Sequence, residues 1–240
     1  MKILNNSPVR VSVIFPSYNE SENIEEAIKR VSKSLGKQLY EVIVVDDNSP
    51  DQTWKIVERL RNPKYKVIRR VKERGLASAI ARGVDEAKGN IVVWMDCDLG
   101  IPPEVVPKLV KKLESYDVAI GSRYVSGGKD SRTTFRRSVS YMMNFFASCM
   151  LGFKVRDYTS GFSAARKKVF DKVKLSKQGF GEYFIDFVHG CIKNDFKIVE
   201  VGYNYRYRKW GISKLDNSLL ALFKFGMQYA YKIVKVRFSN

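Results

Sequence analysis

Short apolar runs and amphipathic stretches alternate along the first half of the chain. The apolar runs predict strands over residues 9–15, 41–45, 66–68, 91–95 and 117–121. Between these runs, apolar residues at helical spacing predict helices over residues 22–35, 53–60, 75–87 and 104–113. Strands that alternate with helices are joined by right-handed crossovers. We therefore expect an α/β domain with a mostly parallel central sheet flanked by helices.

The pattern changes in the second half of the chain. We expect a basic, glycine-containing loop over residues 123–137. Residues 138–153 carry no charge and predict a helix that is either buried in the core or in contact with lipid. A turn-rich loop over residues 157–162 then precedes a helix over residues 180–191 and a strand over residues 196–207.

The C-terminal stretch predicts an amphipathic helix. Apolar residues from Leu219 to Ile233 fall on one helical stripe, whereas Lys224, Lys232 and Lys235 fall on another face. No apolar run reaches the roughly 18 residues that a spanning helix needs, so we expect no membrane span in this chain. We expect residues 216–240 to form a basic helix that lies in a lipid interface or packs against the main domain.

Composition and charge narrow the class of protein. The 240 residues, 45% of them hydrophobic, are enough for one large core. The three cysteines lack the spacing of a disulfide framework or a zinc site, which indicates a reducing compartment. A formal net charge of +18, largely in the second half, requires an anionic partner: nucleic acid, a phosphorylated substrate or an acidic lipid surface.

Two carboxylates follow the apolar run in the middle of the chain. Asp96 and Asp98 come directly after residues 91–95, and their spacing places both side chains on the same side of an extended chain. Oxygen ligands without nearby His or Cys suit Mg²⁺ or Mn²⁺, which proteins often share with substrate phosphates. We therefore expect a divalent metal at this strand end.

Two other strand ends carry related groups. Asp46-Asp47 ends the second strand, and Pro16-x-Tyr18-x-Glu20 ends the first. If these strands are neighbours in a parallel sheet, their carboxyl ends open into one crevice with the aspartate pair. Aromatic and carboxylate groups can hold a base and a ribose while a metal neutralises a diphosphate, so the crevice predicts nucleotide-sugar binding. The absence of G-x-G-x-x-G and Walker motifs disfavours a dinucleotide enzyme and a P-loop kinase.

Seven segments resemble, in order, the motifs of one enzyme family. They are Pro16-Ser-Tyr-Asn-Glu20, Val45-Asp-Asp-Asn-Ser-Pro-Asp51, Arg74-Gly-Leu76, Asp96-Cys-Asp-Leu99 with Pro102-Pro103-Glu104, Gly121-Ser-Arg-Tyr124, Asp157-Tyr-Thr-Ser-Gly-Phe162 and Arg208-Lys-Trp-Gly-Ile-Ser-Lys-Leu215. Together they resemble the inverting GT-A glycosyltransferases of family 2, and within that family the chain looks most like the dolichol-phosphate mannose synthases. The resemblance implies a GT-A fold, with residues 1–215 as the catalytic domain.

The resemblance also assigns residues to the donor. It implies that the guanosine of GDP-mannose is surrounded by Pro16, Tyr18, Glu20, Val45 and Asp47.

The same resemblance places Asp96, Cys97 and Asp98 at the diphosphate, with Asp96 and Asp98 as the metal ligands. Two departures from the family pattern occur here. Gly100 stands where the family often has a Gln metal ligand, so a water or a substrate oxygen would fill that position. Cys97 replaces the usual small Ala, which is expected to be tolerated because the backbone matters at this position.

Basic residues of the second half match phosphate-binding positions of the family. Arg123, Arg208 and Lys214 match positions that meet donor or acceptor phosphates. Arg136 and Ser140, with Arg123, match a pocket for the acceptor's lipid phosphate. Asp98 and Arg123 are the residues expected to act in catalysis.

The resemblance implies inverting transfer of mannose from GDP-mannose to dolichyl or another polyprenyl phosphate, with Mg²⁺ or Mn²⁺ as cofactor. A lipid monophosphate is already an anionic nucleophile, so no general base is required. The implied place is the cytoplasmic face of a membrane, with the membrane surface as a partner. Whether a membrane-spanning partner subunit also exists stays open.

Two alternatives are kept. The first keeps the fold but uses UDP-glucose or another nucleotide sugar, because base contacts are often made by the main chain and are hard to read. The second is a basic nucleic-acid-binding domain, which only the net charge of +18 favours. No recognised RNA- or DNA-binding motif is present, so we expect no nucleic-acid partner.

Overall fold

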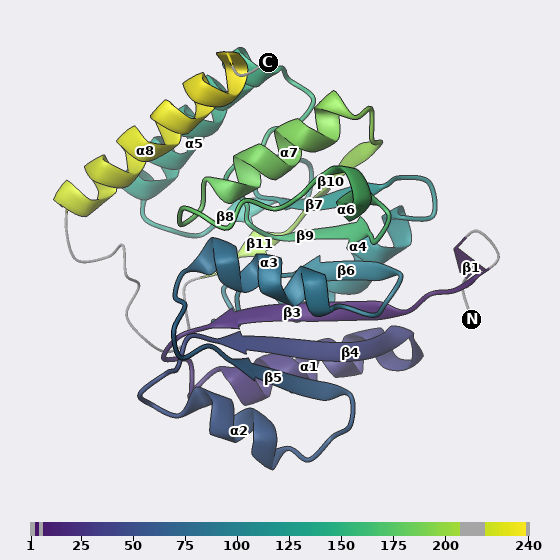
Figure 1. The fold of residues 1–240 in the computed structure, drawn as a ribbon. Helices are drawn as coiled ribbons and strands as arrows, with labels where there is room; N and C mark the ends of the chain where they lie inside the picture. Colours follow the sequence, from purple (N-terminus) through teal and green to yellow (C-terminus); the bar gives the residue numbers. More distant parts are fainter. Residues whose placement is uncertain (1–2, 5–6, 207–218, 239–240) are drawn as a thin grey trace.

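A central sheet of seven strands runs through the computed structural model, which describes residues 3–4, 7–206 and 219–238 (Figure 1). The strand order is β10-β7-β9-β6-β3-β4-β5, and every pairing is parallel except those of β9. The strands are β3 (Val11–Ser17), β4 (Leu39–Asp46), β5 (Tyr65–Arg69), β6 (Ile91–Trp94), β7 (Val118–Ser122), β9 (Ser163–Arg166) and β10 (Ile198–Gly202).

Two small sheets lie outside the central one. β1 (Ile3–Leu4) and β2 (Ser7–Pro8) form an antiparallel pair. β8 (Lys129–Asp130) and β11 (Asn204–Tyr205) form a parallel pair that joins the segment after β7 to the segment after β10.

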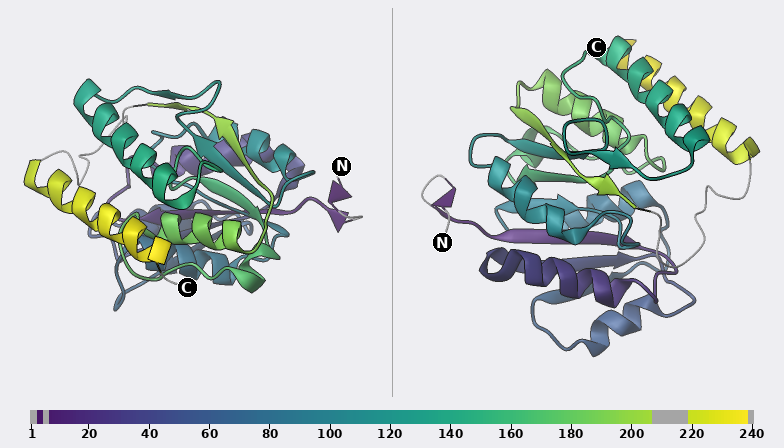
Figure 2. Two further views of the ribbon diagram at one scale, coloured as in Figure 1. Left: turned by 90° about the horizontal axis from the view of Figure 1, so that it is seen from above. Right: turned by 180° about the vertical axis from the view of Figure 1, so that it is seen from behind.

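Helices cover both faces of the central sheet (Figures 1 and 2). One face packs against α3, α6 and α7, and the other packs against α1 and α4. The helices are α1 (Ile24–Leu35), α2 (Thr53–Arg59), α3 (Leu76–Glu86), α4 (Val106–Lys112), α5 (Thr134–Leu151), α6 (Val169–Lys172), α7 (Tyr183–Lys193) and α8 (Leu219–Phe238), with short 3-10 turns η1 (Gly36–Gln38) and η2 (Pro103–Val105).

The alternation of side chains along the buried strands divides the core into two layers. In β3, Ile14 belongs to the layer under α3 and α7, whereas Val13 and Phe15 belong to the layer under α1 and α4. Trp94 at the end of β6 is fully buried, and the ring of Phe187 meets it edge to face at 5.1 Å between centroids. Burial of both faces explains why these strands are runs of apolar residues.

The predicted mostly parallel α/β sheet is confirmed, with one strand missed. β9 pairs antiparallel with β6 and β7 and is fully buried over Ser163–Ala165. Its sequence, Ser-Ala-Ala-Arg, has neither the β-branched residues nor the length that marks a strand. The strand forms because β6 and β7, on either side of it, supply its hydrogen-bond partners.

Pro16 lies inside β3, whereas the sequence pattern had it closing the strand. It pairs with Val45 of β4, and its carbonyl faces β6, where Cys97 Sγ lies 3.8 Å away. The ladder between β3 and β6 already ends at Ile14 and Trp94. The missing N–H of proline therefore leaves no ladder hydrogen bond unmade.

α5 begins at Thr134, so Arg136 and Arg137 lie on a helix and not in the predicted loop. The expected loop is also interrupted by β8. α5 is not the buried core helix that was one of the two expectations. Its inner face buries Asn144, Ala147, Ser148 and Leu151, while Phe135, Tyr141, Met142 and Phe145 are more than half exposed on its outer face.

α5 and α8 lie side by side as an outer layer at the end of the molecule toward which β3 and β4 run (Figures 1 and 2). α8 packs against the domain through Ile233 and Val236, which are buried. Within the described ranges, no helix combines the length and apolar character needed to cross a bilayer.

Contact between α3 and β3 yields the first prediction. A Cβ at Gly83 would overlap Cγ2 of Ile14 and lie 3.1 Å from its Cγ1. We expect Gly83→Ala to lower the free energy of unfolding by about 1–3 kcal/mol, because overpacking outweighs the roughly 1 kcal/mol gain in helix propensity. Urea denaturation followed by circular dichroism measures the change. Asp85→Ala, on the exposed face of α3, is the control, and equal stability of both variants would contradict the packing argument.

Candidate active site

The carboxyl ends of β3, β4 and β6 meet at one edge of the sheet, as the sequence predicted. β3 lies between the other two strands, with Pro16 opposite Val45 and Ile14 opposite Trp94. The segments that follow, which contain Tyr18 to Glu20, Asp47 and Asp96 to Asp98, therefore leave the sheet side by side. β7 runs in the same direction as β6, so Arg123, the residue after β7, also lies at this edge.

Asp96 and Asp98 differ in their surroundings. Asp98 is only 2% exposed, and its Oδ1 accepts a hydrogen bond of 2.9 Å from the backbone N–H of Gly100. Asp96 is exposed. Between Asp98 and Gly100, Leu99 adopts a left-handed conformation with φ of 62°. This uncommon conformation for a leucine turns the chain back so that the N–H of Gly100 reaches the carboxylate.

The space beside Asp98 is closed on the side of Gly100. A Cβ at this position would lie 3.1 Å from Asp98 Oδ1 and 3.2 Å from both the Arg206 carbonyl oxygen and Tyr205 Cζ. Arg206 also donates its backbone N–H to the Gly100 carbonyl at 2.8 Å. The glycine therefore accommodates the chain that follows β11, which explains why this position lacks a longer side chain.

Asp46 ties the ends of β3 and β4 together. It is fully buried and accepts hydrogen bonds from Ser17 Oγ at 2.9 Å and from Ser49 Oγ at 2.6 Å. The backbone N–H of Ser49 donates to it as well, at 2.8 Å. These bonds hold both strand ends and the turn after β4 in a fixed relation.

Asp47 is held by a partner that sequence reasoning missed. Its Oδ1 accepts hydrogen bonds from Nε of Arg70 at 2.7 Å and from Nη2 of the same side chain, and its Oδ2 accepts the backbone N–H of Gly75 at 2.7 Å. Asp46 pairs with Arg69 across β4 and β5, so the residues that follow these strands are neighbours. That register was the signal that could have found Arg70.

Tyr18 and Glu20 lie on the loop after β3 and are partly exposed. The guanidinium of Arg74 lies 5.7 Å from the centre of the Tyr18 ring. Glu20 accepts a hydrogen bond of 2.9 Å from Asn23 Nδ2. Burial raises the pKa of the neighbouring Cys97 thiol, and the carboxylates of Glu20 and Asp98 raise it further. These surroundings favour the protonated form of the Cys97 thiol, whereas metal binding requires the thiolate.

Arg123 is buried and held by carboxylates. Its Nε and Nη2 donate to Asp157 at 2.9 and 2.6 Å, and Nη2 also donates to Thr159 Oγ1 at 2.8 Å. Asp130 lies 3.9 Å from its Nη1. Burial alone would lower the pKa of Arg123, but the Asp157 carboxylate reverses the direction and raises it well above its usual value. The guanidinium therefore stays charged at every physiological pH.

Arg136 and Ser140 lie one turn apart on α5, near the same cluster. The Tyr124 hydroxyl donates to Ser140 Oγ at 2.9 Å, which places Ser140 beside the segment that carries Arg123. Arg208 and Lys214 lie outside the described residues. Their predicted roles at phosphates stay predictions.

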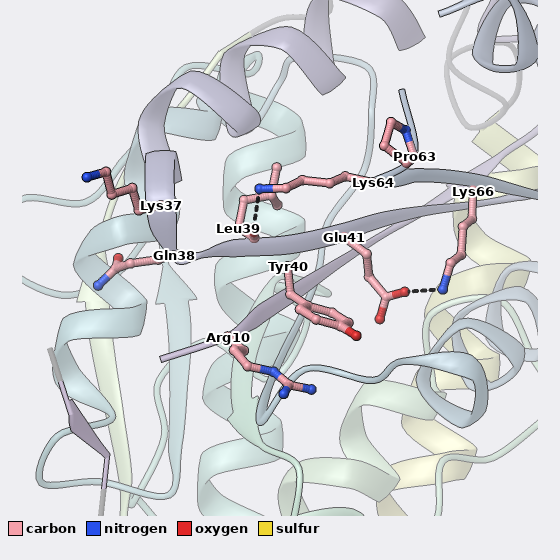
Figure 3. Close-up of a pocket in the computed structure, with 9 residues that line it drawn as sticks. All are labelled: Arg10, Lys37, Gln38, Leu39, Tyr40, Glu41, Pro63, Lys64 and Lys66. Atoms are coloured by element: carbon pink, nitrogen blue, oxygen red, sulfur yellow. Dashed lines mark hydrogen bonds and ion pairs between the residues drawn. The ribbon is translucent and has the colours of Figure 1, made fainter. Parts of the chain in front are cut away.

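Two cavities lie at opposite ends of the strands, one at the carboxyl ends and one at the amino ends. One of about 540 Å³ lies beside the site and is lined by Tyr18, Trp54, Arg69 and Arg74, among others. The other, of about 470 Å³, lies at the amino end of β4 (Figure 3).

Three of the four cations that line the cavity in Figure 3 already contact protein groups. Lys66 pairs with Glu41 at 2.5 Å, Lys64 donates to the Leu39 carbonyl, and the Arg10 guanidinium lies 4.3 Å from the centre of the Tyr40 ring. The cavity beside the site is lined by Tyr18 and so adjoins the predicted nucleotide-binding residues.

The part of the chain that the structure describes contains no group of three or more His, Cys, Asp or Glu side chains that could hold a metal ion. Any cation at this edge would rely on the two carboxylates of Asp96 and Asp98 together with oxygens from a substrate or water. Such a set of hard oxygen ligands suits Mg²⁺ or Mn²⁺ and is unsuited to zinc.

Solved structures share this fold. Glucosyl-3-phosphoglycerate synthase from Mycobacterium tuberculosis, in a complex with Mn²⁺, UDP and phosphoglyceric acid, superposes with a TM-score of 0.75 at 20% identity, covering 96% of this chain and 79% of that chain.

Relatives found by sequence share a higher identity with this chain than that solved structure does. The dolichol-phosphate mannosyltransferase of Pyrococcus furiosus is 41% identical over 95% of this chain, which spans 64% of that protein. The polyprenol monophosphomannose synthase of Mycolicibacterium smegmatis is 35% identical over 90% of this chain and 85% of that protein. Residues 12–174 match the family described as Glycosyl transferase family 2. The chain belongs to this family and is a glycosyltransferase with the GT-A fold.

Proposed function

We propose that the protein transfers mannose from GDP-mannose to dolichyl or another polyprenyl phosphate, with inversion at the anomeric carbon. The observation that carries the proposal is the convergence of the β3, β4 and β6 ends, which brings Asp98 to the same edge as Pro16, Tyr18 and Asp47. Relatives named for mannose transfer to dolichol phosphate and polyprenol support the choice of sugar and acceptor.

The donor lies along this edge in the proposal. Its guanosine occupies the segment formed by Pro16, Tyr18, Glu20, Val45 and Asp47, beside the cavity of about 540 Å³. Its diphosphate lies at Asp96, Cys97 and Asp98. Arg208 and Lys214 meet phosphates from the segment after β11.

Asp96 and Asp98 would hold a divalent cation, Mg²⁺ or Mn²⁺. The donor set fits, because two carboxylates one residue apart leave most of a six-oxygen shell to phosphate and water. When bound, the ion supplies positive charge that stabilises the developing diphosphate leaving group. Gly100 contributes no side-chain ligand, and a Cβ there would be in tight contact with Asp98 Oδ1 and the Arg206 carbonyl oxygen.

The acceptor phosphate approaches from the side of Arg123, Arg136 and Ser140. One of its oxygens attacks the anomeric carbon opposite the diphosphate, the bond from that carbon to the GDP oxygen breaks, and GDP leaves. An α-linked donor thus gives a β-linked lipid phosphate sugar. Asp98 and Arg123 are the residues that act in this step, by holding the donor and by neutralising acceptor charge.

A lipid surface is the proposed site of action, on the cytoplasmic face of a membrane. The outer layer of α5 and α8 exposes Met142, Phe145, Tyr231 and Phe238, each at least 56% accessible. Exposed Arg137, Lys235 and Arg237 lie on the same two helices. Apolar side chains bordered by cations are the surface that an interfacial helix offers to anionic lipid. A membrane-spanning partner subunit is compatible with the same surface.

The donor panel tests the proposal directly. Purified protein is incubated with polyprenyl phosphate, Mn²⁺ and labelled GDP-mannose, UDP-glucose or UDP-mannose, and the lipid fraction is counted. We expect label in the lipid from GDP-mannose. Consumption of UDP-glucose with no turnover of GDP-mannose would move the assignment to the alternative donor. Tight, salt-dependent binding to DNA without any transfer would favour a nucleic-acid-binding domain.

Removal of one carboxylate tests the metal site. We expect Asp98→Ala to weaken Mn²⁺-dependent GDP-mannose binding by at least about tenfold, because loss of a ligand exceeds the loss typical of an outer-shell partner. Isothermal titration with and without Mn²⁺ measures the effect. Asp85→Ala serves as the matched control on the exposed face of α3. Donor affinity in Asp98→Ala that equals the control with Mn²⁺ present would reject this aspartate as a ligand.

Gly100 offers a second test of the same site. We expect Gly100→Gln to lower the melting temperature without tightening Mn²⁺ binding, since its Cβ would press on Asp98 Oδ1 and on the Arg206 carbonyl oxygen. Gly100→Ala separates the effect of the Cβ from that of the Gln side-chain amide, and we expect it to lower the melting temperature as well. A stable Gln variant with higher Mn²⁺ affinity would show that the site accepts a third side-chain ligand.

The outer layer is tested with vesicles of neutral and anionic phospholipid. We expect the double variant Met142→Glu with Phe145→Glu to sediment less with vesicles, because its new carboxylates would have to enter the lipid, which is costly. Tyr40→Glu, at the opposite edge of the sheet, adds one such carboxylate away from the outer layer and should sediment like the unaltered protein (Figure 3). Equal sedimentation of all three proteins would remove the lipid-facing role of α5.

A further inference from the structure

We propose that α8 completes the acceptor side of the active site, and that Tyr229 is the positioning residue through which it does so. The inference rests on the proposed function and adds a role for a helix that lies beyond residues 12–174, the part of the chain that matches the family.

α8 is fixed to the domain at the start of α7. Lys232 pairs with Asp186 of α7 at 2.5 Å, and both side chains are 24% exposed. The ring of Phe225 packs against Phe180, with 5.4 Å between centroids. These contacts bring the middle of α8 over the turn at residues 180–182.

Tyr229 fills the space beside that turn. A Cβ at Gly181 would overlap the Tyr229 hydroxyl, so the hydroxyl occupies the volume that a side chain at position 181 would need. Glu182 completes the turn, because one of its carboxylate oxygens accepts the backbone N–H groups of Phe180 at 2.7 Å and Gly181 at 2.9 Å. The position of the Tyr229 hydroxyl therefore requires glycine at position 181.

The turn leads to the loop that holds Arg123. Tyr183, the first residue of α7, is 1% exposed and donates its hydroxyl to the Gly161 carbonyl at 3.3 Å. The loop over residues 157–162 contains Asp157 and Thr159, both hydrogen-bonded to Arg123. A continuous set of contacts thus runs from α8 through the start of α7 to the arginine proposed to meet the acceptor.

α5 reaches the same loop from its own inner face. Asn144 donates Nδ2 to Thr159 Oγ1 at 2.9 Å, so Thr159 is shared between the helix and Arg123. Of the two helices that expose an apolar outer face, α5 therefore contacts residues 157–162 directly, and α8 contacts them through the start of α7. Binding of α5 and α8 to lipid would therefore affect the geometry around Arg123 through these contacts.

The electrostatic surroundings of Tyr229 agree with this placement. Burial raises the pKa of its hydroxyl, and the carboxylates of Glu182, Asp157 and Asp96 act in the same direction, while Arg123 opposes them. The hydroxyl therefore stays protonated next to the charged groups of the site.

Tyr229→Phe is the decisive variant, with Tyr231→Phe as its matched control. Tyr231 lies on the same helix but is 69% exposed on the outer face. We expect Tyr229→Phe to lower kcat/KM for the polyprenyl phosphate by roughly tenfold to a hundredfold, because small displacements of reacting groups are costly. The KM for GDP-mannose and the melting temperature should stay unchanged, and Tyr231→Phe should match the unaltered protein in every measurement.

Gly181→Ala gives the reciprocal test, since it displaces the same hydroxyl without altering Tyr229. Gly181→Ala should lower kcat/KM for the polyprenyl phosphate as Tyr229→Phe does. Hydrogen exchange of residues 157–162 supplies a readout that does not depend on turnover, and both variants should exchange faster there than Tyr231→Phe. Unchanged exchange in both variants, or equal losses toward donor and acceptor, would overturn the role of Tyr229. Faster exchange in a protein that transfers no mannose would instead reject the proposed function alone.

Discussion

The burial of Asp98 is the constraint on which the site depends. A carboxylate that is 2% exposed is costly to bury unless hydrogen bonds or positive charge stabilise it. The left-handed turn at Leu99 brings the Gly100 N–H to this carboxylate, and the glycine in turn allows the chain after β11 to approach. Conformation, packing and charge at the end of β6 are therefore set together, and a change to any one of them alters the other two.

The residues that sequence reasoning located are those whose position follows from strand period and strand order. Asp96, Asp98 and Pro16 follow apolar runs, and parallel neighbours must end at one edge, so their convergence was predictable. The position of β9 was not predictable, because its four residues carry no strand pattern and the strand depends on pairing with β6 and β7. Arg70 was missed for a related reason, since its contact with Asp47 depends on the register between β4 and β5.

The second half of the chain was harder to predict because one face of its long helix packs against the protein while the other face is exposed. Residues 138–153 lack charge, which fits both a core helix and a lipid-facing one. The structure divides the helix between these environments, with Asn144 bonded inward and Phe145 exposed next to it. Because the polar residues at the inner positions are uncharged, no charged residue distinguishes the inner face from the outer one over residues 138–153. A hydropathy pattern alone does not distinguish a face that contacts the protein from one that is free.

The two sides of the site are held by different kinds of contact. On the side proposed for the donor, Asp46 binds Ser17 at the end of β3 and Asp47 binds Arg70 directly after β5, so the sheet itself fixes the geometry. On the side proposed for the acceptor, Arg123 depends on a loop that α5 and α7 hold from outside the sheet. Contacts within a buried sheet open only with global unfolding, whereas those of surface helices can open locally. In the proposed function, the side of Arg123 is therefore the half of the site that can respond to a lipid surface, while the side of Asp46 and Asp47 stays formed.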